Sequence, residues 1–453
     1  MTVSKSRIAP TRSLFFKRIR SRAQSSGLTL VEIMIALTMT LIVLGAMMSA
    51  FRFASEKMQE GRGVMEMANR LRSAEDLLRN DLGNLTVDPR PYTEAASPNG
   101  FLAINEGRFN DASSGAAGTS YLGDIDDSIG MTVRSADGRR FRGVRNNGAG
   151  PVVIESTVAE VWYFTTLNDV SDSAVAATGD PTLVQIEDSV RLHRRALLIR
   201  PDLGVLVSNL PLDDPDPTVD DVDSFVATND ISVRVEVEPD GEYSIVANSL
   251  ADLALRRNRF AHLAPTLTAS NFPNSPTALM TLARLKPNGE DILLTDVAGF
   301  DVRVYSPNAE VQRVGGLLLE PGDPGYVAAG TGGPEVGAFV DLGYKNTAFT
   351  PAETEWFATL PTLGSQLAPT RNYDTWSPLY ESDGIDQDGI AGADQGTNGL
   401  NDGGTAAPDD DAERETRPPY PFPIRGIQIS TRLIEKTTQQ VSQSSIIQSY
   451  VPE

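Results

Sequence analysis

The sequence contains no cysteine and only two histidines, His193 and His262, among its 453 residues. Without cysteine the chain has no disulfide, no thiolate metal ligand and no cysteine nucleophile. Two isolated histidines argue against His-based catalysis and against a His-rich zinc site. The chain also lacks a Gly-Lys-Ser/Thr phosphate loop and a Gly-x-Ser-x-Gly nucleophile turn. We therefore expect a protein that is not an enzyme and has no catalytic residues.

One long apolar run, from Leu28 to Phe51, contains a single charged side chain, Glu32. A helix of this length is long enough to cross the ~30 Å hydrocarbon core of a membrane. A carboxylate in such a segment costs about 2.5–3.5 kcal/mol at mid-bilayer, so it normally has a partner. If the chain were cut after Gly27, Leu28 would carry a free α-amine one helical turn before Glu32. The amine and the carboxylate could then pair within one chain or between neighbouring chains.

Charge is distributed unevenly around this run. The whole chain carries 60 acidic and 39 basic residues, a formal net charge of −21. Residues 1–27 nevertheless contain no acidic residue and seven basic ones: Lys5, Arg7, Arg12, Lys17, Arg18, Arg20 and Arg22. Basic flanks of a membrane segment stay cytoplasmic, so we expect the acidic bulk on the extracytoplasmic side. Such a surface repels phosphates and disfavours nucleic-acid partners.

The residues at the start of the apolar run form a recognisable pattern. After the basic leader the chain reads Gly27, Leu28, Thr29, Leu30, Val31 and Glu32, followed by about twenty apolar residues. This pattern resembles the type IV prepilin signature, although the family more often has Phe or Met where Leu28 stands. The resemblance implies cleavage after Gly27 by a prepilin peptidase and methylation of the new amine on Leu28. It further implies a role for Glu32 in assembly of a helical filament.

A helical pattern continues beyond the apolar run but becomes amphipathic. Apolar residues recur at spacings of three and four, typical of one face of a helix: Val64, Met67, Leu71, Ala74, Leu78, Leu82 and Leu85. Gly61 and Gly63 are weak points where the helix could bend. Asp88-Pro89 and Arg90-Pro91 end the pattern. We predict one helix of up to ~58 residues, half apolar and half packed on a globular domain.

The rest of the chain is predicted to be rich in strands. Alternating or apolar runs indicate strands near residues 152–165, 183–200, 231–237, 242–246, 291–305, 335–342, 425–435 and 440–451. Residues 250–263 look helical, and residues 92–150 look like loop with one short strand at 101–104. The predicted fold is α+β: a long N-terminal spine helix packed on an antiparallel β-sheet head with large loop insertions.

A second, weaker pattern lies within two of these strands. It consists of Ala159, Glu160, Val161, Trp162 and Tyr163, then, after a linker, Arg191, Leu192, His193, Arg194 and Arg195. The order is similar to a hairpin of the larger minor pilins, including J-type pseudopilins of type II secretion. It favours a hairpin at these residues.

The sequence suggests six segments. They are the leader (1–27), a transmembrane or filament-core helix (28–53), its amphipathic extension (54–86), a β-rich extracytoplasmic head (87–373), an acidic Gly/Asp-rich loop (374–420) and C-terminal strands (421–453). One elaborated head and two subdomains are both compatible with this division.

The acidic loop is a candidate calcium site. Its candidate oxygen ligands are Asp383, Asp386, Asp388, Asp394, Asn398 and Asp402, interleaved with glycines. The spacing does not match an EF-hand, and a flexible acidic surface loop explains the same composition. Ca²⁺ is thus the one cofactor that the composition suggests.

The resemblance implies a minor pilin or pseudopilin, J-type in a type II secretion pseudopilus or W-type in a type IV pilus, at or near the filament tip. Its expected partners are prepilin peptidase, other pilins or pseudopilins, the assembly platform and membrane lipid. Its expected location is the bacterial inner membrane, crossed once, with the N-terminus cytoplasmic. The alternative is an anchored extracytoplasmic receptor for calcium, cargo or a surface.

Overall fold

The computed structural model describes residues 29–91, 99–106, 124–125, 127–136, 138–148, 150–167, 190–211, 222–237, 242–261, 286, 289–321, 323, 326, 335–344, 372–382, 392, 394–401, 408–409, 413, 419–420, 422–435 and 440–450. The chain divides into two compact units, Met1–Gly61 and Arg62–Glu453. We call the second unit the head.

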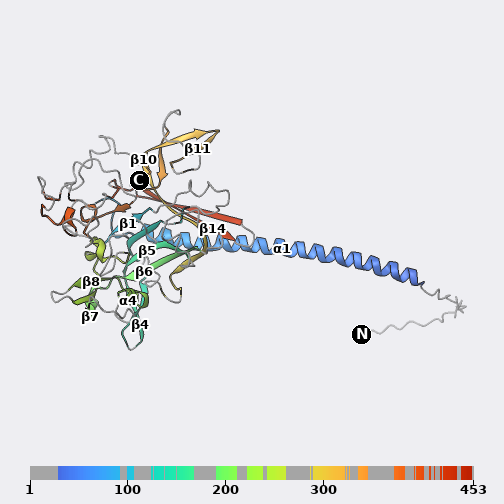
Figure 1. Cartoon of the computed structure of the whole chain (residues 1–453), viewed down its shortest axis with the longest axis horizontal. Helices are drawn as coiled ribbons and strands as arrows, with labels where there is room; N and C mark the ends of the chain where they lie inside the picture. Colours follow the sequence, from blue (N-terminus) through green and yellow to red (C-terminus); the bar gives the residue numbers. More distant parts are fainter. Residues whose placement is uncertain are drawn as a thin grey trace, which may run out of the picture. The chain divides into compact units, whose positions relative to one another are not determined.

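A single α-helix, α1, spans Leu30–Gly83 and is drawn in blue in Figure 1. We call Leu30–Gly61 its apolar segment, after the uncharged run Ile33–Phe51 that makes up most of it, and Arg62–Gly83 its head segment. The prediction of one long helix is confirmed, and Gly61 and Gly63 do not interrupt it. The helix ends before the proline pairs because the chain after Gly83 turns to join a strand: Leu85 forms a β-bridge with Val133.

By length and composition, the apolar segment is long and apolar enough to cross a membrane. Its most apolar eighteen-residue window has a mean hydropathy of 2.3, and none of that window is buried. A helix that is apolar around its whole circumference is typical of a membrane or of the core of an assembly.

The head is built around a ten-stranded antiparallel sheet. Eight strands follow the order β13-β1-β2-β5-β6-β10-β14-β15, while β11 and β12 pair with β10. The bounds are β1 Leu102–Asn105, β2 Ser128–Arg134, β5 Val158–Leu167, β6 Val190–Leu198, β10 Ile292–Val314, β11 Leu317–Leu319, β12 Glu335–Val340, β13 Asn372–Asp374, β14 Gly426–Glu435 and β15 Gln440–Ser449. The long helix and this sheet confirm the α+β class.

Smaller elements complete the head. They are the hairpin of β3 (Phe141–Asn146) and β4 (Pro151–Ser156), and a second sheet in the order β7-β9-β8, formed by Val205–Pro211, Glu242–Ala247 and Val233–Val237. A short helix, α4 (Val222–Thr228), lies between β7 and β8 in the chain. Within the described residues the 3₁₀ turns are η2 Pro201–Leu203, η3 Asp252–Ala254, η4 Arg256–Asn258, η8 Ser377–Leu379 and η9 Gln395–Thr397.

Each face of the large sheet has its own hydrophobic core. On one face the head segment of α1 contributes Met67, Leu71, Ala74, Leu78 and Leu82 to the first core. On the other face side chains of β5 and β6 join the small sheet and α4 in a second core. Figure 1 shows the strands β5 and β6 between the end of α1 and the group of β7, β8 and α4. The head is therefore layered, with the large sheet in the middle.

Most predicted strands are confirmed. The alternating run at 231–237 contains β8, the runs at 291–305 and 335–342 contain β10 and β12, and the last two runs are β14 and β15. Strand β10 continues to Val314, beyond the predicted end at residue 305, because both β11 and β12 pair with its second half.

The prediction of a single short strand within residues 92–150 missed two others. Besides β1, this region contains β2 and β3. Gly130 weakens the apolar alternation of β2 in the sequence, but the structure requires it. A Cβ atom at this position would lie 2.5 Å from the Trp162 ring of the neighbouring strand. Only a residue without a side chain lets the indole cross β2 here.

The helix predicted at residues 250–263 is also absent from its described part, 250–261, which forms the 3₁₀ turns η3 and η4. Side chains take the carbonyl groups that a helix would use. The Asn258 amide donates to the Asp252 carbonyl at 2.8 Å, and the Arg259 guanidinium donates to the Leu253 carbonyl at 2.8 Å. Such local side-chain bonds compete with helix formation.

Candidate functional site

The predicted processing site lies at the edge of what the structure describes. Gly27 and Leu28 fall outside the described residues, while Thr29 and Glu32 lie within them. Thr29 immediately precedes α1, and its backbone N–H and its hydroxyl both donate to Glu32 Oε2 at 3.1 Å. In return the Glu32 N–H donates to Thr29 Oγ1 at 3.3 Å. These reciprocal bonds form a capping box, which closes the first turn of a helix.

From the sequence, Glu32 was expected to pair with the Leu28 amine, and its role in capping the start of the helix was missed. The signal was present, because Thr29 and Glu32 stand three residues apart at the start of an apolar run. Glu32 also lies in the first turn of α1, where the positive end of the helix dipole favours a negative charge. The carboxylate is thus held at the helix start whether or not a free amine is nearby.

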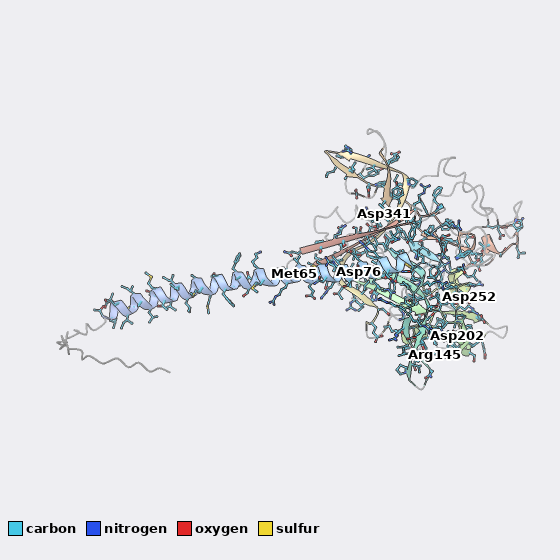
Figure 2. The ribbon with its side chains drawn as sticks, turned by 180° about the vertical axis from the view of Figure 1, so that it is seen from behind. Met65, Asp76, Arg145, Asp202, Asp252 and Asp341 are labelled. Carbon is cyan, nitrogen blue, oxygen red and sulfur yellow. The ribbon has the colours of Figure 1, made fainter. Side chains whose placement is uncertain are left out.

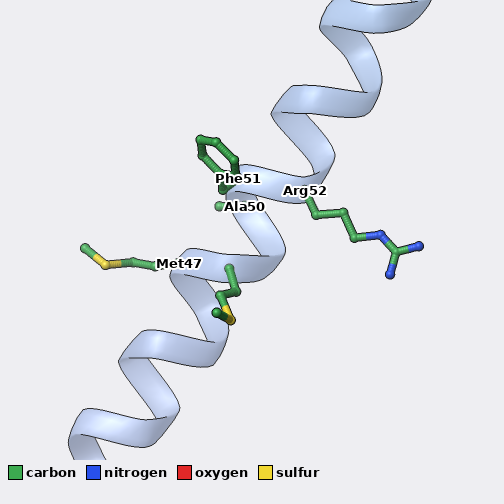
Figure 3. A pocket seen from close by; sticks show the side chains of 5 residues that line it. Met47, Ala50, Phe51 and Arg52 are labelled. Carbon is green, nitrogen blue, oxygen red and sulfur yellow. The ribbon is translucent and has the colours of Figure 1, made fainter.

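The apolar segment exposes nearly all of its large side chains. They include Leu30, Val31, Ile33, Met34, Ile35, Leu37, Met39, Leu41, Ile42, Val43, Leu44, Met47, Met48, Phe51 and Phe53. A shallow hollow occurs between Met47, Met48, Ala50, Phe51 and Arg52, shown in Figure 3. All five line one stretch of a single helix, so this hollow is a gap between neighbouring side chains and not a substrate cavity.

The head segment of α1 is anchored by a buried polar contact. Asp81 is fully buried and accepts hydrogen bonds from the Tyr163 hydroxyl at 2.7 Å and from Arg194 Nε at 2.9 Å. Burial, together with the negative charge of Asp81, raises the pKa of the Tyr163 phenol well above its ordinary value. Met65 and Asp76, labelled in Figure 2, lie on exposed positions of the same segment. One face of the segment therefore binds the sheet, and the other faces outward.

The predicted hairpin pattern forms adjacent antiparallel strands. Tyr163 on β5 lies opposite Arg194 on β6, and Trp162 lies opposite Arg195. The two faces of this strand pair point to different cores. Tyr163 belongs to the core shared with α1, whereas Trp162 belongs to the core shared with the small sheet.

Glu160, in the same pattern, is fully buried. Its carboxylate accepts hydrogen bonds from Trp162 Nε1 at 2.9 Å, the Phe260 N–H at 2.7 Å and the Ser232 hydroxyl at 2.5 Å. Desolvation by burial raises the pKa of this carboxyl, although the three donors oppose the shift. Arg195 is equally buried and contacts Asp230 at 2.6 Å and Asp291 at 3.2 Å. These buried residues join the layers of the head.

Of the two histidines, only His193 lies in the described part of the chain. Its ring is buried, stacks on Phe164 and lies 2.7 Å from the Thr166 hydroxyl through Nε2. Burial lowers the pKa of His193 to about 4, so the imidazole is neutral near pH 7. His262 lies outside the described residues.

The predicted calcium ligands are only partly described. Asp383, Asp386, Asp388 and Asp402 lie outside the described residues. Asp394 adopts a left-handed backbone conformation (φ 62°) before η9, and Asn398 Oδ1 accepts a hydrogen bond from the Leu400 N–H at 2.7 Å. The described members of this loop therefore form turns.

A different acidic group comes together within the described residues. Ligand oxygens of Glu106, Asp124 and Asp127 all lie within 4.8 Å of one another, and all three residues are buried. Glu106 accepts a hydrogen bond from the Leu342 N–H at 3.3 Å, and Asp127 accepts one from the Val302 N–H at 2.7 Å. Oxygen ligands of this kind suit a hard cation such as Ca²⁺. Sequence reasoning missed the group because Glu106 is distant in the sequence from the two aspartates.

Neither a protein-family model, nor a curated protein, nor a solved structure matches the chain. The functional argument therefore depends on the residues themselves.

Proposed function

We propose that this protein is a minor subunit of a pilin-type filament, a type II secretion pseudopilus or a type IV pilus. In this proposal the chain is cleaved after Gly27 and assembles through its N-terminal helix. The observation that carries the proposal is one uninterrupted helix, Leu30–Gly83, with two different surfaces. The most apolar eighteen residues of its apolar segment are not buried, and its head segment is packed on an antiparallel sheet.

The exposed apolar segment needs an apolar surrounding outside its own chain. Soluble proteins rarely expose contiguous apolar surfaces of more than a few hundred Å². Before assembly a bilayer would cover the segment, and in a filament the helices of neighbouring subunits would cover it. One helix serves both states because both surround it on all sides.

Glu32 has two separable roles in this proposal. Its hydrogen bonds to Thr29 cap the helix, and its negative charge would neutralise the Leu28 amine of the same or an adjacent subunit. An isolated charge in an apolar surrounding is energetically costly, so pairing the Glu32 carboxylate with the amine is favourable there. The pairing would set the register between subunits.

The size of the head favours a position at or near the filament tip. The head comprises Arg62–Glu453 and carries several elements beyond the sheet that holds the helix. A head of this bulk is difficult to repeat at every position of a thin fibre. A tip subunit has neighbours on one side only and tolerates the extra volume.

The decisive experiment determines the N-terminal residue and the intact mass of the protein extracted from membranes. The proposal expects a chain that begins at Leu28 and carries one added methyl group. Gly27→Glu is the matched variant, and it should leave the leader attached while the protein still inserts. A wild-type chain that retains residues 1–27, or begins elsewhere, would contradict the proposal.

A pair of substitutions at Glu32 separates capping from charge pairing. Glu32→Gln can keep the capping box because a Gln side chain also accepts the Thr29 bonds, whereas Glu32→Ala loses both the cap and the charge. Both variants should insert in the membrane, and both should fail to enter filaments if the charge is needed. Normal incorporation of Glu32→Gln would remove the pairing role and leave only the cap.

A second proposed function is a cation-dependent receptor displayed on the same anchor. The specific observation is the buried group of Glu106, Asp124 and Asp127. Calorimetry on the full chain in detergent, with calcium at up to millimolar concentration, tests it. Asp127→Asn should abolish the heat if this group binds, and the paired change Asp386→Ala with Asp388→Ala should abolish it if the acidic loop binds. Absence of calcium heat in the wild type would reject both sites.

A further inference from the structure

The two ends of the eight-strand path through the large sheet are protected very differently. At one end β13 is only three residues long, Asn372–Asp374, and all three are buried. At the other end β15 is ten residues long, Gln440–Ser449, and its side chains alternate between half-buried and exposed over most of its length. In the part of the chain that the structure describes, β15 has a strand on one side only.

Strand β15 lacks the features that usually guard an edge. Natural sheets blunt their edges with short strands, charged side chains, proline or bulges. The sequence of β15, QVSQSSIIQS, contains no charged residue, no proline and no glycine. Its ten residues also pair with β14 in one unbroken register, without a bulge. This edge is therefore a regular template for a further strand.

The exposed apolar residues of β15 are placed symmetrically. Val441 is 44% exposed and Ile447 is 57% exposed. They are six residues apart and so share one face of the strand, because side chains alternate with a period of two. Ser444 lies midway between them. An interface between two identical chains requires that if residue i contacts residue j, then j contacts i.

We infer that β15 pairs antiparallel with β15 of a second copy of this chain, about a two-fold axis at Ser444. In this register Val441 of each copy lies opposite Ile447 of the other, and Gln443 lies opposite Ser445. The two exposed apolar residues then cover each other at both ends of the strand pair. The inference is independent of filament assembly, since it uses only the sheet edge.

Charge and area both bear on where this pairing occurs. The chain carries a formal net charge of −21, which opposes self-association, but β15 itself adds no charge at the contact. Adding one strand buries less than the ~1,600 Å² of a standard stable interface. The pairing should therefore be weak in dilute solution and favoured when membrane anchoring raises the effective concentration.

Cysteine cross-linking tests the register, because the native chain contains no cysteine. Directly opposed residues of antiparallel strands have Cα atoms about 4.5–5.5 Å apart, within the range that a disulfide spans. The full chain carrying Ser444→Cys, in membranes under mild oxidation, should form a disulfide-linked dimer of twice the chain mass. Ser445→Cys is the control. In this register position 445 lies opposite Gln443 of the other copy, so the two introduced cysteines are too far apart to form a disulfide. Ser445 is more exposed than Ser444, so a lack of cross-linking there would not reflect poor access.

A charge exchange then tests the pairing itself. In the Ser444→Cys background, Val441→Lys should lower dimer yield about tenfold, because it places an ammonium group opposite Ile447. Adding Ile447→Glu should restore the dimer. The register places positions 441 and 447 of the two copies opposite each other at both ends, so the introduced opposite charges would pair.

Three results would overturn the inference. These are no dimer from Ser444→Cys, equal dimer from both cysteine variants, or a cross-linked product with the mass of a different protein. The last result would assign the edge to a strand from another polypeptide.

Discussion

The apolar segment and the head segment of α1 belong to one helix but differ in where their apolar side chains go. Leu44 in the apolar segment is 52% exposed, whereas Leu78 in the head segment is 1% exposed. Both are leucines in regular helix. The difference lies in the neighbouring residues of each helix part. Around Leu44 apolar residues lie on every face of the helix, whereas around Leu78 they lie on one face only.

This comparison shows that spacing, more than apolar content, determines whether a helix is buried by its own chain. A one-sided stripe fits one face of a sheet, as Leu71, Ala74 and Leu78 do here. A helix that is apolar all round cannot be covered by one sheet face, so it needs an environment that surrounds it. Four predictions test this distinction, beginning with the largest expected effect.

Replacing Asp81 should have the largest effect on the head. Asp81→Ala leaves the half-buried Arg194 guanidinium without its carboxylate, and breaking a largely buried pair of this kind costs up to about 3–5 kcal/mol. Denaturant unfolding of the full chain in detergent, followed by tryptophan fluorescence, measures this loss. Asp81→Asn is the control, because its amide oxygen can still accept the Tyr163 bond, and its loss should be smaller. Equal stability of Asp81→Ala and wild type would show that the contact does not anchor the helix.

Truncating a leucine in each segment compares the two environments directly. Leu78→Ala should reduce the free energy of unfolding of the head by about 2–5 kcal/mol, because it leaves a cavity in a packed core. Leu44→Ala removes the same atoms from an exposed position and should leave head unfolding unchanged. Similar losses from both substitutions would contradict the division of α1 into two environments.

Removing the cap should affect only the start of the apolar segment. Thr29→Ala deletes the hydroxyl that caps the first turn, a change that costs about 0.5–2 kcal/mol. Amide hydrogen exchange in detergent should become faster in the first turn of α1. Thr38→Ala is the control, since its hydroxyl bonds to the Met34 and Ile35 carbonyls within the helix. Faster exchange in both variants would argue against a specific capping role.

Alkaline pH should weaken the head segment's anchor. The pKa of Tyr163 is raised in the folded head, so folding favours its neutral form. Stability is then complete below the unfolded phenol pKa of ~10 and falls as pH rises above it. Unfolding midpoints measured from pH 8 to 11 should show this fall. Tyr163→Phe should lose about 1 kcal/mol at neutral pH and show a flatter pH dependence; an unchanged pH slope would assign the effect to other groups.

Several elements could be predicted because their signals are local. The long helix follows from apolar spacing, and β8, β10, β14 and β15 follow from alternation. Strand β2 could not be predicted, because Gly130 is needed by Trp162 on another strand. The acidic group could not be predicted either, since Glu106 reaches the loop of Asp124 and Asp127 only through folding.

The sequence by itself determined the long helix, its division into an all-apolar and a one-sided part, and most strands. These features depend on residues a few positions apart, whose periodicity is visible in the chain. Only the tertiary structure decided that Asp81 meets Tyr163 and Arg194, that Glu160 is buried among three donors, and that β15 ends the sheet. Those outcomes join residues far apart in the chain, and they depend on strand order and packing that no local pattern records.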